Sequence, residues 1–199
     1  MQVGRDMLGV LCSVETTRCV MWSRLGSANI RETQKAAPPL ARRGSSLAKY
    51  ADSFLFRSGG FSFDTDVKAR VEVYDLATNT WSEAPRLNIR RSHHSSCVAG
   101  HVLAVFGGAA LGERGECHLE TIDAHAVVRG GEVAWERIPL SIPRRSHAMM
   151  VALNSAEIFI AGGEGGTEAG QDSYVVNLND RTTLVTAVCA GLNVDSDYN

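Results

Sequence analysis

The chain lacks long hydrophobic runs, and no segment approaches the ~18 consecutive apolar residues that a membrane-spanning helix needs. It also lacks a large excess of either charge, because its formal net charge is only -2. A balanced charge with 44% hydrophobic residues argues against a disordered chain and against a nucleic-acid partner. We therefore expect a soluble globular protein that binds neither a membrane nor a nucleic acid.

Cysteines are few and scattered, and none of them forms a Cys-x-x-Cys pair. Their number is odd, at five: Cys12, Cys19, Cys97, Cys117 and Cys189. This usage does not suit a disulfide framework and indicates a reducing compartment, so we expect a cytoplasmic protein.

Catalytic signatures are missing as well. We find no nucleophile elbow, no phosphate-binding loop and no paired carboxylates. The run Gly162-Gly163-Glu164-Gly165-Gly166 is rich in glycine, but it ends an apolar strand and does not open a helix that could hold a phosphate. The sequence predicts no enzyme activity and no cofactor.

One group of histidines and cysteines has the composition of a metal site, namely His93, His94, Cys97, His101, Cys117 and His118. However, Cys97 and Cys117 fall on expected strands that lie two strand spacings apart, roughly 9–10 Å. Zinc holds its sulfur ligands at ~2.3 Å. We therefore expect no metal ion from this group, since only residues from loops could converge, and we interpret His93 and His147 as hydrogen-bonded repeat positions.

What the chain does have is an internal repeat of about 50 residues, a period typical of propeller blades. Each repeat begins with a pair of arginines, and a Gly-Gly pair follows at the end of a short apolar run. The three arginine pairs are Arg42-Arg43, Arg90-Arg91 and Arg144-Arg145, and the three glycine pairs are Gly59-Gly60, Gly107-Gly108 and Gly162-Gly163.

Each repeat contains four short segments rich in β-branched and aromatic residues and bounded by turn residues. The expected strands are 44–50, 53–58, 70–76 and 80–84, then 93–99, 102–107, 117–123 and 133–138, then 147–152, 156–162, 173–178 and 182–188. Because helical spacing is not sustained anywhere in this region, we predict an all-β fold.

The order Gly-Gly, Tyr, Trp, Pro, Arg resembles the kelch repeat of β-propellers. The first repeat shows it best, with Tyr74 seven residues before Trp81, then Pro85 and Arg91. The second keeps Trp135 but has Ile122 in place of the Tyr, and the third has Thr183 or Leu184 where a Trp is expected. The resemblance implies a partial kelch-type β-propeller of about three four-stranded antiparallel blades, at 43–85, 91–139 and 145–188, followed by a C-terminal tail, 189–199.

Most of the repeated residues have structural reasons to be there. Glycines at the end of a strand permit positive φ and a close approach of neighbouring backbone. Large aromatic side chains bury area between blades, and we place Trp81 between blades one and two. This structural set comprises Gly59, Gly60, Tyr74, Trp81, Gly107, Gly108, Trp135, Gly162 and Gly163.

Residues 1–42 differ from the repeats. Residues 1–50 hold eight Lys/Arg against three Asp/Glu, which leaves this end of the chain basic. A presequence is one interpretation. In the other, residues 17–22 form the outer strand of a preceding blade, which requires an insertion of about eleven residues between Trp22 and Arg43.

The kelch resemblance also implies a partner-binding face near the arginine pairs. It aligns Arg43, Arg91 and Arg145 with the family's Arg position, and Arg42, Arg90 and Arg144 lie beside them. Six guanidinium groups on one rim would favour an acidic peptide. Alternatively, one Arg of each pair bonds carbonyls of the adjoining blade, or acidic residues after the glycines neutralise the rim: Asp64, Asp66, Glu113, Glu116, Glu164 and Glu168.

The sequence thus predicts a protein-interaction module that binds a protein or an acidic peptide through the loops between blades. One alternative is a piece of a propeller enzyme whose catalytic residues lie on missing blades. The other is a truncated, non-functional propeller. With three blades, we expect the first and the third each to leave an apolar face uncovered, which favours self-association.

Overall fold

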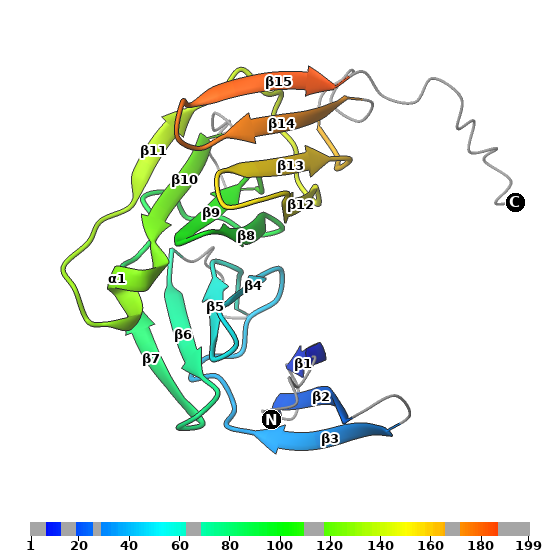
Figure 1. Cartoon of the computed structure of the whole chain (residues 1–199), viewed down its shortest axis with the longest axis vertical. Helices are drawn as coiled ribbons and strands as arrows, with labels where there is room; N and C mark the ends of the chain where they lie inside the picture. The colour runs from blue at the N-terminus through cyan, green and yellow to red at the C-terminus, as the bar shows by residue number, and fades with distance from the viewer. Residues whose placement is uncertain are drawn as a thin grey trace, which may run out of the picture.

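The computed structural model describes residues 7–12, 19–25, 29–62, 69–109, 118–165 and 172–186. In these residues the chain forms three four-stranded antiparallel sheets, one three-stranded sheet and one short helix (Figure 1).

We call the four-stranded sheets blades. Blade one is β4 (Ser46–Tyr50), β5 (Phe54–Ser58), β6 (Val71–Asp75) and β7 (Thr80–Ala84). Blade two is β8 (Ser95–Ala99), β9 (Val102–Phe106), β10 (His118–Asp123) and β11 (Glu136–Pro139). Blade three is β12 (Met149–Ala152), β13 (Glu157–Ala161), β14 (Ser173–Asn177) and β15 (Thr182–Thr186).

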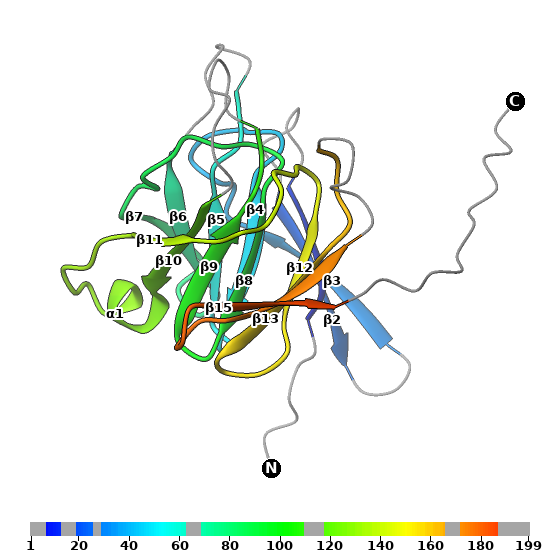
Figure 2. The ribbon, with the colours of Figure 1, turned by 90° about the horizontal axis from the view of Figure 1, so that it is seen from above.

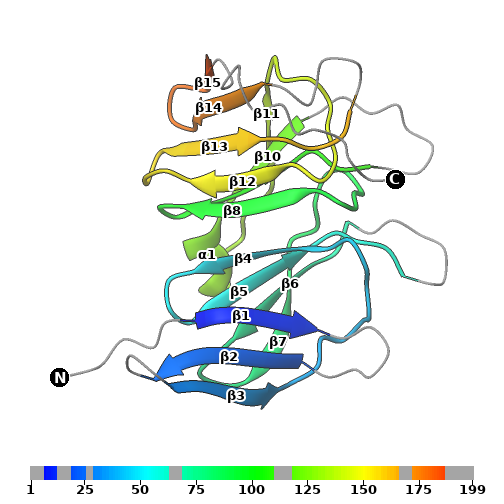
Figure 3. The same cartoon turned by 90° about the vertical axis from the view of Figure 1, so that its right-hand side faces the viewer.

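The blades fan out around a common centre. Figure 1 shows β4, β8 and β12 on the inside of the arc and β7, β11 and β15 on its outside. In Figure 3 the inner strands β4, β8 and β12 follow one another through the stack. The all-β architecture with blade-like sheets is the fold predicted from the repeat.

One element departs from the all-strand expectation. Helix α1 (Ala124–Val128) lies in the connection between β10 and β11. The side chain of Asp123 starts it by accepting hydrogen bonds from the backbone N–H groups of His125 and Ala126, at 2.9 and 3.1 Å. The local cap therefore produces one helical turn without any longer helical period in the sequence.

The three-stranded sheet precedes blade one and consists of β1 (Met7–Cys12), β2 (Cys19–Leu25) and β3 (Asn29–Lys35). The indole N–H of Trp81 donates to the carbonyl of Ala36, just after β3, at 2.9 Å. The indole N–H of Trp135 donates in the same way to Pro85, just after β7, at 2.7 Å. Relative to Trp81, β3 therefore has the place that β7 has relative to Trp135. The expected outer strand around Trp22 is instead the middle strand β2, and β3 lies where an insertion was expected.

Two hydrophobic cores fill the seams between the blades. Strand β9 contributes to both, because alternate side chains of a strand point to opposite faces. Leu103 and Val105 face blade one, whereas Ala104 and Phe106 face blade three, and all four are buried. Among the described residues, no helix has the length and apolar character that crossing a bilayer requires.

The far side of blade three is different. The strand register places Val151, Phe159, Val175 and Leu184 in one row across its four strands. Val151 is 46% exposed and Leu184 is 66% exposed. Within the described residues, this apolar face is therefore only partly covered.

Candidate partner-binding face

The segments that lead into the inner strands carry the arginine pairs, and backbone bridges align them. Arg43 bridges Phe61, Ser92 bridges Ala109 and Ser146 bridges Glu164. The residues before these bridges, Arg42, Arg91 and Arg145, are therefore equivalent. The sequence alignment, which matched Arg43 with Arg91 and Arg145, was wrong by one residue in the first repeat.

The three equivalent arginines are buried, with 3%, 3% and 2% of Arg42, Arg91 and Arg145 exposed. Each guanidinium donates to the carbonyl of the first glycine in its own blade and to a second carbonyl at the start of the third strand or just before it. The distances are 2.7 and 3.0 Å for Arg42, 2.9 and 3.2 Å for Arg91, and 3.1 and 3.0 Å for Arg145. These arginines therefore satisfy carbonyls of their own blade, not of the adjoining one, and do not present their charge to a partner.

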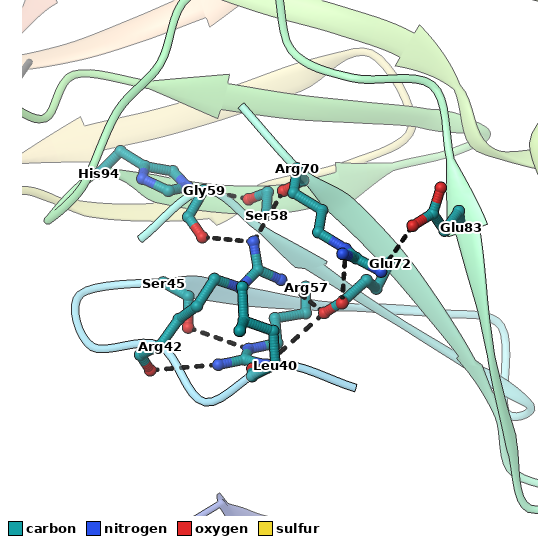
Figure 4. A network of polar contacts seen from close by, with 10 residues as sticks. All are labelled: Leu40, Arg42, Ser45, Arg57, Ser58, Gly59, Arg70, Glu72, Glu83 and His94. Carbon is teal, nitrogen blue, oxygen red and sulfur yellow. Dashed lines mark hydrogen bonds and ion pairs between the residues drawn. The ribbon is translucent and has the colours of Figure 1, made fainter. Parts of the chain in front are cut away.

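In blade one this arginine belongs to a buried ionic network (Figure 4). The Glu72 carboxylate lies 2.5 Å from the Arg42 guanidinium, 3.5 Å from that of Arg57 and 2.9 Å from that of Arg70. Arg70 also reaches Glu83 at the outer strand, at 2.6 Å. Burial lowers the pKa of Arg42 to about 10, an effect that the charge of Glu72 opposes.

Blades two and three have weaker versions of this arrangement. In blade two the carboxylate of Glu120 is 3.5 Å from Arg91, and burial raises its pKa although Arg91 and Arg137 oppose the shift. In blade three Tyr174 replaces the acid, and the guanidinium of Arg145 lies 5.0 Å from the centre of its ring. The Nη2 atom of Arg145 is buried and has no hydrogen-bond partner among the described residues.

The repeated glycines form the contact between successive blades. Gly60 donates its N–H to the carbonyl of Arg91 at 2.8 Å, and Gly108 donates to that of Arg145 at 3.0 Å. A Cβ at Gly107 would lie 2.4 Å from the Arg145 carbonyl oxygen, and the φ of Gly107 is +74°. Only glycine fits both conditions. At Gly162, which ends the same strand in blade three, a Cβ would meet nothing within 4 Å in the described structure.

The aromatic positions pack on the preceding blade. Trp81 is half-buried against Tyr74, with ring centres 4.9 Å apart, and it points its indole N–H at Ala36. Its expected place between blades one and two was wrong, because that seam is filled by Trp135, which is buried against the end of blade one. Thr183 pairs with Val176 as Trp81 pairs with Tyr74, so Thr183 holds the Trp position of blade three.

The exposed arginines are the other members of the pairs, Arg43, Arg90 and Arg144. They lie at one end of the blades, because backbone hydrogen bonds join the three segments there. His93 donates its N–H to Gly44 and His147 donates to His93, both at 2.8 Å. We call Arg43, Arg90 and Arg144 the arginine rim.

Aromatic rings lie beside the arginine rim. The rings of Phe61 and His93 have centres 5.6 Å apart, and those of His93 and His147 are 4.6 Å apart. Burial, together with the neighbouring His147, lowers the pKa of His93. The carboxylate of Glu164 is 3.7 Å from the Nδ1 atom of His147. The other acidic residues expected after the glycines, Asp64, Asp66, Glu113, Glu116 and Glu168, lie outside the described residues.

The histidines and cysteines of the excluded metal group are spread over the blades. His94 is buried in the seam between blades one and two, where its Nε2 atom is 2.8 Å from the Ser58 hydroxyl, and burial lowers its pKa to about 3. Burial raises the pKa of the Cys97 thiol to about 12, so this thiol is unreactive. Cys117 and Cys189 lie outside the described residues. No cluster of three or more His, Cys, Asp or Glu side chains with metal-binding geometry occurs in the part of the chain that the structure describes.

Comparison with known families gives one match. The kelch motif matches residues 58–88, a stretch that begins at the glycines of blade one and ends after β7. A search of curated proteins found no match. The matched stretch contains Gly59, Gly60, Tyr74 and Trp81, whose positions the blade geometry explains. The chain therefore contains a kelch motif, and its three four-stranded antiparallel sheets are consistent with kelch blades.

Proposed function

We propose that this kelch-repeat module binds a protein partner through the arginine rim and takes no part in catalysis. Kelch repeats generally mediate protein binding. The single observation that supports the choice of this surface is the different placement of the two arginines in each pair. One Arg is buried in the blade, and the other is exposed at the same end of all three blades.

The chemistry of this face favours an acidic peptide. Guanidinium groups form bidentate, charge-assisted hydrogen bonds with carboxylates. Exposed ion pairs contribute only ~0–1 kcal/mol each and are screened by salt. Binding therefore needs several arginines at once and weakens as the ionic strength rises. A cytoplasmic location is part of this proposal.

Charge reversal at two rim positions tests the proposal. The double variant Arg90→Glu, Arg144→Glu should lose most of its binding to a glutamate-rich peptide, measured by fluorescence anisotropy at low salt. Its Tm should change only slightly, because both side chains are exposed and interactions of exposed charges contribute only ~0–1 kcal/mol each. Arg86→Glu is the matched control, since Arg86 is exposed but lies outside the three segments of the rim. Equal binding by the wild type and the double variant would assign peptide binding to another surface.

The alternative that the chain is a piece of a propeller enzyme has no supporting observation within the described residues. The alternative of a truncated propeller that does not fold alone has a specific one, namely the partly covered face of blade three with Val151 and Leu184. Light scattering distinguishes it, because that alternative predicts oligomers or aggregates instead of a monodisperse monomer.

A further inference from the structure

Three polar side chains from three separate segments meet at the end of the blades opposite the arginine rim. Tyr50 is the last residue of β4, His101 lies in the turn between β8 and β9, and His125 lies in α1. The hydroxyl oxygen of Tyr50 is 2.9 Å from the Nδ1 atom of His101 and 2.9 Å from the Nδ1 atom of His125. The two imidazole rings have centres 5.1 Å apart. Both rings therefore turn the same nitrogen toward one oxygen.

The fold holds these groups in place. The Tyr50 ring is buried and packs on Phe54 and Phe56, with ring centres 6.4 Å apart in each case. The backbone N–H of Ala124 donates to the carbonyl of His101 at 2.7 Å, which ties α1 to the β8–β9 turn. Because the backbone of each segment is fixed by such contacts, the three donor atoms converge without a flexible loop.

We propose that Tyr50, His101 and His125 form a binding site for a divalent transition-metal ion that joins blades one and two. Metal–nitrogen and metal–oxygen bonds of ~2.0–2.1 Å at tetrahedral angles place neighbouring ligand atoms roughly 3.3 Å apart. The observed 2.9 Å distances from the Tyr50 oxygen to each Nδ1 atom are somewhat shorter than this, so binding must move the Tyr50 oxygen and the two nitrogen atoms apart. Two imidazoles and one phenol oxygen suit zinc or copper, not calcium or magnesium.

The proton balance of binding follows from the hydrogen bonds. Without metal, the Tyr50 hydroxyl donates to one Nδ1 atom, and the Nδ1–H of the other histidine donates to the Tyr50 oxygen. On binding, Tyr50 loses its hydroxyl proton to solvent and coordinates as phenolate. The neutral histidine that carries its proton on Nδ1 changes tautomer, so that the proton is on Nε2 and Nδ1 is free to coordinate, and this change releases no proton. One proton therefore leaves for each ion bound.

The site is independent of the proposed peptide-binding function. Strand β4 runs from Ser46, near the arginine rim, to Tyr50, a span of about 13 Å at 3.3 Å per residue. Figure 2 shows α1 at the lower end of the blades. Metal binding and peptide binding can thus be measured separately, and either can fail without the other.

Titration of the tag-free full chain with copper(II) tests the proposal. We expect one copper ion per chain and a visible phenolate-to-copper charge-transfer band, and zinc(II) in large excess should compete for the same site. Tyr50→Phe should abolish the band and weaken copper binding at least about 10-fold, and His125→Gln should weaken it similarly. Zinc(II) should also raise the Tm of the wild type but not that of Tyr50→Phe.

The matched control is His147→Gln, because His147 belongs to the other pair of neighbouring imidazoles. This variant should bind copper as the wild type does. Thermal unfolding of each metal-free variant checks folding. If Tyr50→Phe fails to fold, His101→Gln replaces it, since His101 is exposed in a turn. Equal copper affinity in the wild type and in the folded variants, or a wild type without the charge-transfer band, would overturn the site.

Discussion

Blade one and blade three place the same arginine in different surroundings. Arg42 and Arg145 each donate to a glycine carbonyl and to a second carbonyl of their own blade. Arg42 also pairs with the buried Glu72, whereas Arg145 lies over the Tyr174 ring and meets no acid among the described residues. The shared feature is therefore the pair of carbonyl bonds. In both blades the arginine satisfies backbone carbonyl groups. The group that faces its positive charge differs, since it is a carboxylate in blade one and an aromatic ring in blade three.

The glycines give the same comparison for the contact between blades. Gly59 is covered by the Arg91 carbonyl of blade two, and Gly107 by the Arg145 carbonyl of blade three. Gly162 has the same left-handed backbone, with φ of +66°, but no neighbour within 4 Å of its absent Cβ in the described structure. Blade three thus keeps the left-handed glycine that the other blades use in their contact with the next blade, although its own outer face is only partly covered.

The largest expected effect comes from adding a side chain at Gly107, where blade two contacts blade three. Gly107→Val should destabilise the chain by about 5 kcal/mol, because overpacking against the Arg145 carbonyl adds to the strain of a positive φ. Gly162→Val should cost only about 1–2 kcal/mol, since strain alone remains. Urea denaturation of both variants measures the difference. Equal losses would mean that Gly162 is covered as Gly107 is.

A second expected difference separates the two arginines. Arg42→Met should cost about 3–4 kcal/mol, because it removes one partner of a buried ion pair and leaves Glu72 with Arg57 and Arg70. Arg145→Met should cost about 1–2 kcal/mol, since two carbonyls lose a donor but a buried cation disappears as well. The free energies of unfolding compare them. A larger loss for Arg145→Met would show that Arg145 has an acidic partner outside the described residues.

The raised pKa of Glu120 predicts a pH dependence of the stability. Burial raises its pKa above the ordinary 4.5, so the folded state binds more protons than the unfolded state in the window just above pH 4.5. The stability that protonated Glu120 contributes is therefore lost as the pH rises through this window. Glu120→Gln should remove this loss, because the amide does not titrate. The urea midpoint, measured across a pH series that brackets 4.5, should fall less steeply for Glu120→Gln than for the wild type. Parallel curves would contradict the assignment.

The smallest effect is expected at the outer edge. Trp81→Phe removes the hydrogen bond to Ala36 and should cost about 1 kcal/mol. Trp135→Phe removes the corresponding bond to Pro85 from a more buried ring and should cost more. Thermal unfolding of the two variants ranks them. No change in Tm for Trp81→Phe would mean that the three-stranded sheet does not support blade one through this bond.

Much of the fold is encoded locally, and this part could be predicted from the sequence. Alternation of apolar residues and the Gly-Gly pairs placed the strands of the three blades close to their observed bounds. The spacing between the arginine and glycine pairs is 16 or 17 residues, so it could not decide between Arg42 and Arg43. Gly44 was the available signal, because it shares the left-handed backbone of His93 and His147. Aligning Gly44 with these histidines gives the correct register.

The remaining features depend on tertiary contacts. Glu72 and Glu120 each interrupt an apolar strand, which hints at a buried partner but does not identify it. His101 and His125 lie 51 and 75 residues after Tyr50 in the sequence. The three residues meet only because blade two stacks on blade one. No spacing rule within one segment brings such residues together. The placement of Trp81 failed for a related reason, since the sequence does not indicate which neighbouring blade a ring will contact.

Strand order has a consequence for how the protein is made. Every sheet is a meander in which each strand pairs with the strands adjacent to it in the chain. Blade one can therefore complete the hydrogen bonds within its own sheet while blade two is still inside the ribosome. The carbonyl of Arg91, which accepts a hydrogen bond from Gly60 at the contact between the two blades, is added later. Folding can thus advance along the nascent chain one blade at a time, with each finished blade serving as the template on which the next one docks.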